Sequence, residues 1–164
     1  MFSDCVWLQR ARRTSANGDS KRRGVEADAR VGLNPIFAVF AHGTFNDAKY
    51  VHRVTDGGHN LEGVPVYGVA RSTLESGLDF ESGGVAGSLW AAYTGPFTPI
   101  NEPDVRTSPY TLVHFRTTVP VRGKWSLGLG VQNVLHRRAI ELRAAGFVSP
   151  TQPRTFLVTV RYAG

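Results

Sequence analysis

Five histidines are the side chains of this sequence best suited to hold a metal ion, so their spacing is the first test for chemistry. Protein zinc sites often place two histidines three to five residues apart, and many use pairs of cysteines. No two histidines here have that spacing, and the only cysteine is Cys5. A single cysteine excludes an internal disulfide and a cysteine-pair zinc site. The sequence therefore predicts no metal site.

Patterns that would indicate catalysis or a bound nucleotide are incomplete. Glu75 and Asp79 share one face of a predicted strand, but simple alternation explains their positions. The segment from Gly128 to Asn133 begins like a dinucleotide fingerprint but lacks its third glycine and the helix that should follow. No Gly-x-Ser-x-Gly nucleophile elbow is present. We expect neither an enzyme nor a cofactor.

The length and net charge of the chain limit the number of domains and the kinds of partner to consider. A chain of 164 residues suits about one domain, and its net charge of +6 raises the question of a nucleic-acid partner. The later arginines are dispersed among apolar positions, and no helix-turn-helix or RNA-recognition pattern occurs. Asp19 interrupts the early basic residues, which are Arg10, Arg12, Arg13, Lys21, Arg22 and Arg23. We expect no nucleic-acid partner.

Neither a transmembrane helix nor an export signal is evident. A membrane-spanning helix needs about 20 mostly apolar residues, and no segment qualifies. Asp4, Gln9 and Arg10 interrupt the early apolar run, so the start does not resemble a signal peptide. The chain is therefore either cytoplasmic or lacks the beginning of an exported protein.

Alternation with a period of two residues dominates the sequence. From Gly24 to Leu33 apolar residues occupy one parity, and Glu26, Asp28 and Arg30 occupy the other. This pattern predicts a strand with one apolar and one charged face. It recurs often enough to predict about eight antiparallel strands, beginning with a short one near Ser3–Gln9.

The lengths of the predicted connections alternate as well. Short turns, such as Asn34-Pro35 and Arg122-Gly123, follow every second strand, and the others are joined by loops of roughly 10 to 18 residues. Outer-membrane barrels pair short periplasmic turns with longer extracellular loops, and their tilted strands need about 9 to 11 residues to cross the membrane. The predicted fold is an all-β, up-and-down transmembrane barrel segment.

Aromatic residues support the same orientation. Phe37, Phe80, Trp125 and Tyr162 lie on the apolar parity beside the short turns or near the chain end, where a periplasmic aromatic girdle is expected. The opposite parity would face a wet lumen. Its titratable members are predicted to be Glu26, Asp28, Arg30, His42, Glu75, Asp79, His114, Arg116 and Arg161. These charges would crowd a small eight-stranded barrel, so we expect an open, curved sheet from a wider one.

Several segments resemble the last third of TonB-dependent outer-membrane receptors of the siderophore-receptor type. Their order and spacing carry the resemblance, which extends over almost everything from residue 20 onward. The matching segments include Ser20-Lys-Arg-Arg-Gly24, Phe40-Ala-His-Gly-Thr-Phe-Asn-Asp47, Gly68-Val-Ala-Arg71-Ser-Thr-Leu74, Trp125-Ser-Leu-Gly-Leu-Gly130-Val-Gln-Asn133 and Pro153-Arg-Thr-Phe156.

The resemblance implies a barrel of about 22 strands with an N-terminal plug, located in the outer membrane of a Gram-negative bacterium. Residues 1–19 would form a short strand and a partly disordered loop, and residues 20–164 would form the C-terminal barrel segment without the plug. Such a fragment would meet outer-membrane lipid and lipopolysaccharide, and would depend on a missing N-terminal region for the TonB system. It would not transport a ligand alone.

The resemblance also implies a ferric siderophore or similar ligand. Anion-attracting candidates occur in two predicted long loops and are His52, Arg53, His59, Arg137, Arg138 and Arg143. Solvated loop charge, with lipopolysaccharide phosphate nearby, explains the same residues. The alternative function is a small autonomous or structural outer-membrane barrel without active transport.

Overall fold

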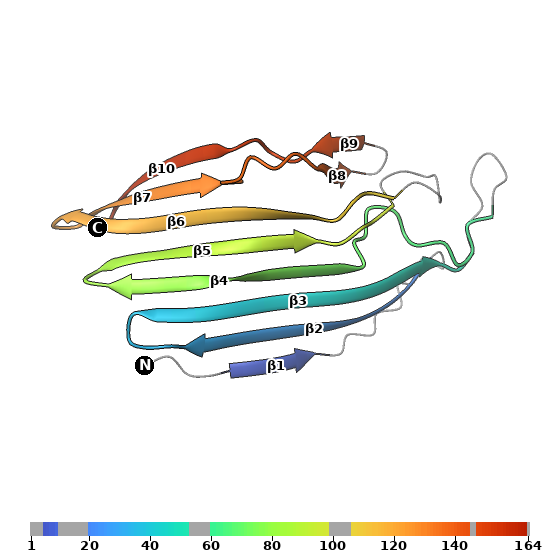
Figure 1. Ribbon diagram of the computed structural model, residues 1–164, viewed down its shortest axis with the longest axis horizontal. Helices are drawn as coiled ribbons and strands as arrows, with labels where there is room; N and C mark the ends of the chain where they lie inside the picture. Colours follow the sequence, from blue (N-terminus) through green and yellow to red (C-terminus); the bar gives the residue numbers. More distant parts are fainter. Residues whose placement is uncertain (1–4, 10–19, 53–59, 99–105, 145–146, 164) are drawn as a thin grey trace.

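A single antiparallel sheet forms most of the structure (Figure 1). The computed structural model describes residues 5–9, 20–52, 60–98, 106–144 and 147–163, which contain β-strands and no helix. The sheet has eight strands in the order β1-β2-β3-β4-β5-β6-β7-β10. Its strands are β1 (Cys5–Gln9), β2 (Ser20–Gly32), β3 (Phe37–Tyr50), β4 (Ser72–Ser82), β5 (Val85–Thr94), β6 (Tyr110–Arg122), β7 (Trp125–Gln132) and β10 (Thr155–Tyr162).

Connections of two lengths lie at opposite ends of this sheet (Figure 1). We call these ends the turn end and the loop end. Residues 33–36, 83–84 and 123–124 make the turns, and residues 51–71, 95–109 and 133–154 make the long connections. The predicted alternation is confirmed, and the strand order is that of an up-and-down sheet.

The tight turns follow from their residues. Gly83 and Gly84 both have positive φ angles, 59° and 81°, which a two-residue hairpin turn of the favoured type requires. The turn between β2 and β3 has four residues instead of the predicted two. Its Asn34 Oδ1 accepts hydrogen bonds of 2.8 Å from the backbone N–H groups of Ile36 and Phe37. This side-chain capping lets the turn close with two additional residues.

One face of the sheet is apolar and uncovered. The register joins Val39, Leu78, Leu89 and Phe115 in a row across four strands, and the same parity continues onto β2, β7 and β10. Leu89 is 48% exposed and Val158 is 69% exposed, although both are large apolar residues. The apolar rows therefore do not converge on a protein core, as the strand pattern predicts for a face that meets lipid.

Aromatic pairs mark the turn end of this face. Phe37 lies directly opposite Phe80, and Trp125 lies directly opposite Tyr162. The Trp125 and Tyr162 rings are 4.9 Å apart and tilted by 50°. Such cross-strand aromatic contacts stabilise neighbouring strands. The four aromatics predicted to lie at this level are therefore found there.

A small cluster of buried residues lies at the loop end. Ala48 and Tyr50 of β3 pack against Leu61 and Val66 of the connection that follows, and the backbone of Val66 donates a 2.9 Å hydrogen bond to the Ala48 carbonyl. The connection thus folds back beside β3 and extends the sheet locally.

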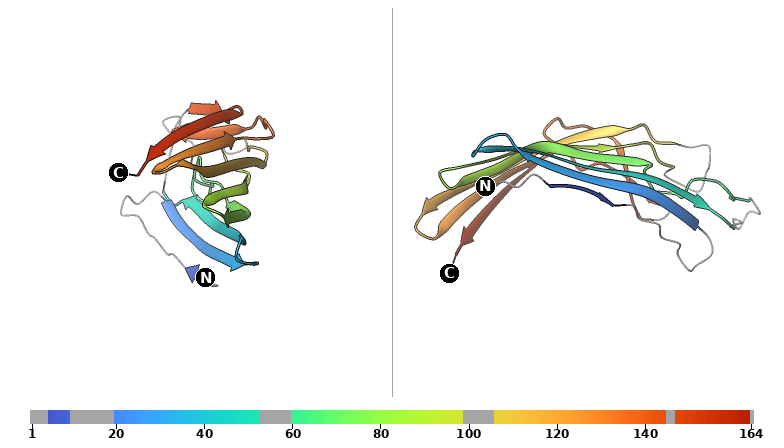
Figure 2. Two further views of the ribbon diagram at one scale, coloured as in Figure 1. Left: turned by 90° about the vertical axis from the view of Figure 1, so that its left-hand side faces the viewer. Right: turned by 90° about the horizontal axis from the view of Figure 1, so that it is seen from below.

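A two-stranded hairpin, β8 (Ile140–Ala144) and β9 (Phe147–Pro150), lies within the last long connection (Figure 1). The sequence predicted only a loop there. The sheet as a whole is curved, and β1 and β10 are its two edges (Figure 2). Among the described residues no helix could cross a membrane.

Candidate functional site

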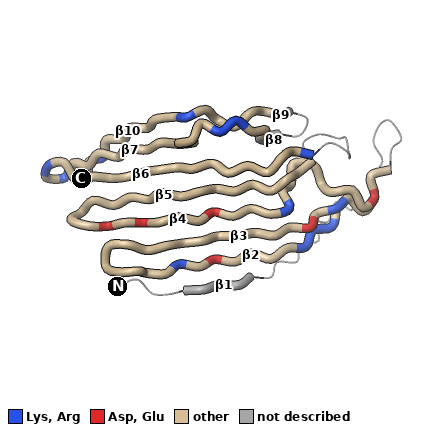
Figure 3. Tube along the Cα trace, viewed as in Figure 1, with Lys and Arg blue, Asp and Glu red and all other residues tan. Residues whose placement is uncertain are grey.

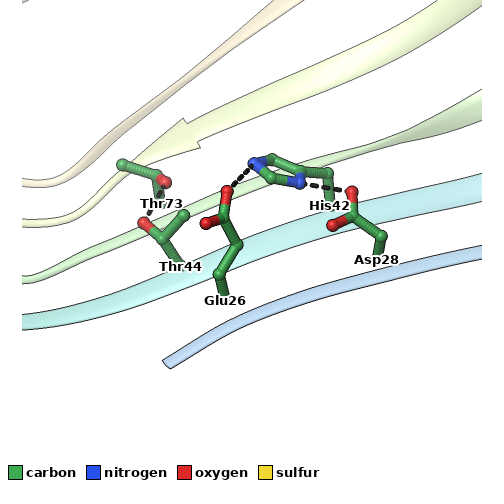
Figure 4. Close-up of polar contacts among 5 residues, drawn as sticks. All are labelled: Glu26, Asp28, His42, Thr44 and Thr73. Carbon is green, nitrogen blue, oxygen red and sulfur yellow. Dashed lines mark hydrogen bonds and ion pairs between the residues drawn. The ribbon is translucent and has the colours of Figure 1, made fainter. Parts of the chain in front are cut away.

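The polar face carries the predicted titratable residues, and on β2 to β4 they pair with one another. Asp28, His42 and Glu75 lie directly opposite one another on three adjacent strands. His42 Nδ1 is 2.5 Å from Asp28 Oδ1, and His42 Nε2 is 3.6 Å from Glu26 Oε1 (Figure 4). Their side chains are 39% to 53% exposed, so each contact contributes about 0–1 kcal/mol. The cluster orders the face more than it stabilises the fold.

A second polar contact crosses over β3. Arg30 Nη1 of β2 lies 2.5 Å from Asp79 Oδ2 of β4, and the Ser88 hydroxyl of β5 donates to Asp79 Oδ1 at 2.5 Å. Ala38 of β3 lies opposite Asp79 and is 1% exposed. A small residue at this position leaves room for the arginine to reach across the intervening strand. Asp79 therefore connects three strands of the sheet.

An aromatic platform occupies the centre of the polar face. Trp90 stacks on His114 with ring centroids 5.1 Å apart, and Arg116 Cζ lies 5.5 Å from the Trp90 ring. Gly77 lies opposite Trp90, and a Cβ added there would come within 2.6 Å of Trp90 Cβ and 2.9 Å of the Phe40 ring. Glycine at this position lets Phe40 and Trp90 approach each other over the sheet, which explains a tryptophan on the polar parity.

Near the β10 edge the polar face forms a shallow trough of about 200 Å³. Its floor includes Gly128 and Gly130, and Arg116 and Arg161 both line it. Unlike Arg30, neither of these arginines forms an ion pair with a carboxylate of the described residues. The polar face is therefore self-paired on β2 to β4 and cationic toward β10.

Among the described residues, no contact joins the loop side chains that are predicted to bind a ligand. His52, Arg137 and Arg138 are exposed at the loop end. Arg53 and His59 lie outside the described residues. Arg143 belongs to β8, and its side chain is likewise not described. Their role in ligand binding stays a prediction.

An asparagine that the sequence reasoning missed anchors the last long connection. Asn133 is 2% exposed and has a positive φ of 51°. Its amide nitrogen donates to the carbonyls of Arg137 and Gln152, at 2.9 and 2.7 Å, and its Oδ1 accepts from the Arg137 N–H at 2.8 Å. Positive φ favours asparagine as well as glycine, so its place just after a strand was the available signal.

The described residues do not gather three or more histidine, cysteine, aspartate or glutamate side chains in an arrangement that would hold a metal ion. The contacts of the polar face are hydrogen bonds, ion pairs and ring stacking. This arrangement can bind charged or aromatic groups by complementarity.

Residues 3–134 match the family described as TonB dependent receptor-like, beta-barrel, and the chain belongs to that family. Its members are receptor and transporter barrels of the Gram-negative outer membrane. No curated protein gave a significant sequence match.

Solved structures share this fold at low sequence identity. BauA, the ferric preacinetobactin receptor from Acinetobacter baumannii, matches 97% of this chain and 25% of its own, with a TM-score of 0.74 and 13% identity. FyuA, the ferric yersiniabactin uptake receptor from Yersinia pestis, matches 99% of this chain and 28% of its own, with a TM-score of 0.70 and 17% identity.

The copper transporter OprC matches 96% of this chain and 28% of its own, with a TM-score of 0.72 and 16% identity. The chain thus spans about a quarter of the length of these relatives. At these identities the similarity shows the fold alone.

Proposed function

We propose that residues 20–164 form C-terminal strands of the barrel of a TonB-dependent outer-membrane receptor, with residues 1–19 contributing β1 and a loop. The observation that carries this proposal is the division of one uncovered sheet into an apolar and a polar face. An apolar face that stays 48% exposed at Leu89 and 69% exposed at Val158 needs an apolar solvent. We infer that this solvent is outer-membrane lipid.

The same division supports a position facing the barrel lumen for the other face. Glu26, His42 and Asp79 form hydrogen bonds and ion pairs there, and polar contacts of this kind suit a wet interior. The strands β1 and β10 are edges of the sheet, and lipid cannot satisfy unpaired backbone groups. We infer that both edges pair with further strands of a larger barrel, so that this segment alone is not transport-competent.

The proposed cargo is a ferric siderophore or a similar chelate. Two of the structural relatives are named as a ferric preacinetobactin receptor and a ferric yersiniabactin uptake receptor, and a third is named as a copper transporter. Exposed His52, Arg137 and Arg138 at the loop end would attract an anionic chelate, together with Arg53, His59 and Arg143. Energy for uptake would come through TonB, which other regions of a receptor contact.

Location and assembly test the proposal directly. An epitope tag placed in the native gene should recover the product from outer membranes, in a form that shifts on gels after heating. Recovery from the cytosol alone would contradict a membrane barrel. A heat-shifting band of only this chain's 17.9 kDa would favour the small autonomous barrel, and a much larger heat-shifting product supports the receptor.

Uptake assays then test the cargo. Deletion of the gene should reduce accumulation of iron supplied as ferric chelates, and loss of copper accumulation alone would redirect the assignment toward metal-ion transport.

A further inference from the structure

Basic residues gather on β2 and β3 at the loop end (Figure 3), and the register places several of them on the apolar face. Beyond the last apolar pair, Val25 and Phe45, the register places Arg23 opposite Asp47. The next position of the same face places Lys21 directly opposite Lys49. We call Lys21, Arg23, Lys49 and Arg71 the rim patch.

Carboxylates of the described residues pair with only one member of the rim patch. Lys49 Nζ lies 3.4 Å from Asp47 Oδ1, which is the one ion pair between the patch and a carboxylate of the described residues. Neither Lys21 nor Arg23 forms an ion pair with a described carboxylate. Like charges directly opposite each other on neighbouring strands are unfavourable. An anion between Lys21 and Lys49 would remove this repulsion.

Apolar and cationic groups meet where the patch begins. Arg71 Cζ lies 5.2 Å from the centre of the Phe45 ring, so its guanidinium covers the aromatic that ends the apolar rows. A groove of about 250 Å³ beside it is lined by Arg23, Val25 and Phe45. A second hollow of about 350 Å³ is lined by Lys49, Arg71 and Phe97, and also by Asp47, the residue that Lys49 contacts. Each hollow therefore offers a positive charge beside apolar surface.

The height of the patch suits a membrane surface. On β3 the apolar parity runs from Phe37 to Phe45, with an aromatic at each end, and Asp47 and Lys49 continue it outward. Aromatic residues mark the two interfaces of transmembrane segments, and long barrel loops point to the cell exterior. The rim patch would therefore lie at headgroup level in the outer leaflet.

Building on the proposed outer-membrane location, we propose that the rim patch binds the phosphate groups of lipopolysaccharide. Lysine and arginine form charge-assisted hydrogen bonds with phosphate. The glucosamine phosphates would lie between Lys21, Arg23 and Lys49, and the first part of an acyl chain would lie along Val25 and Phe45. Arg71 would close the site from the β4 side.

Binding of purified lipid A to the full chain in detergent micelles tests this site. The variant K21Q/K49Q should bind bisphosphorylated lipid A on the order of tenfold more weakly than the unmodified chain. The matched control R122Q/K124Q removes two charges from the turn end and should change the affinity by less than about twofold. Dephosphorylated lipid A should bind all three proteins equally weakly.

Equal binding of phosphorylated and dephosphorylated lipid A would overturn the proposal, as would an equal loss in the control variant or no binding at all. A second measurement uses the tagged native product extracted from outer membranes, where K21Q/K49Q should carry less co-purifying lipid A phosphate than R122Q/K124Q. Unchanged phosphate would likewise overturn the site. Absence of the product from outer membranes would instead contradict the proposed function, while the micelle assay still decides the phosphate site.

Discussion

The two faces of the sheet differ in the contacts that their side chains make. On the apolar face, Leu89 and Val158 have large exposed surfaces and no covering layer. On the polar face, Arg30, Asp79 and His42 lie within ion-pair distance of partners on neighbouring strands. This difference supports the proposed place of the sheet between lipid and a wet lumen. Burial of a hydrophobic core organises most soluble domains, whereas the core cluster of the described residues is small and lies at the loop end.

The largest expected effect comes from placing a charge on the wrong face. L89R should destabilise the protein in lipid vesicles by about 2–4 kcal/mol, because arginine near the membrane midplane loses its hydration. A92R is the matched control, since Ala92 lies on the polar face directly opposite Glu75. Denaturant unfolding in vesicles measures both. Equal stabilities for the two variants would show that the faces do not meet different solvents.

Two glycines on opposite faces of the sheet should differ in how much an added methyl group destabilises the protein. G77A should cost about 1–3 kcal/mol, because the added Cβ would lie 2.5 Å from the Leu89 carbonyl oxygen and 2.6 Å from Trp90 Cβ. In G43A the nearest atom would be Leu74 Cδ1 at 3.6 Å, an ordinary contact. The same unfolding measurement should therefore show little change for G43A. A large loss there with none in G77A would contradict the packing of the aromatic platform.

Removal of charges should separate structural ion pairs from loosely held ones. D79N weakens contacts with both Arg30 and Ser88 and should destabilise by about 1 kcal/mol, a value reduced by the partial exposure of this pair. D47N removes only the 3.4 Å contact with Lys49 and should change stability by less than about 0.5 kcal/mol. If D47N were the more damaging variant, the paired network of the polar face would not be structural.

The smallest effect is expected at the cationic end of the polar face. R161Q should change the unfolding free energy by less than about 0.5 kcal/mol, because Arg161 is exposed and pairs with no described carboxylate. A marked loss of stability, measured in the same vesicles, would reveal a structural role for the trough. A marked gain would show that Arg161 and Arg116 repel each other there.

The strands were predictable because the alternation of apolar and polar residues within each strand reflects the two environments that its faces meet. Val25 and Glu26 begin two alternating rows that the structure keeps on opposite faces, and Gly83-Gly84 is a turn signal by itself. The β8–β9 hairpin was not predicted, because its strands of five and four residues are too short for alternation to stand out from a loop.

The contacts of the polar face were less predictable. Trp90 interrupts an otherwise polar row, and its reason lies on other strands, in Gly77 and His114. The partner of Asp79 is Arg30, which comes from a strand two positions away. Asn133 likewise depends on Gln152, far along the chain. The residue types at these positions indicated that the side chains are polar or aromatic, but not which residues they would contact.

The sequence alone determined the all-β class, the two-faced strands and the arrangement of short turns and long loops, because backbone alternation and turn chemistry are local properties. Only the tertiary structure decided which charged side chains form ion pairs with one another, which do not, and that Lys21 lies opposite Lys49. Those outcomes depend on the register between strands, and a register shift of one residue would exchange every side chain between the two faces.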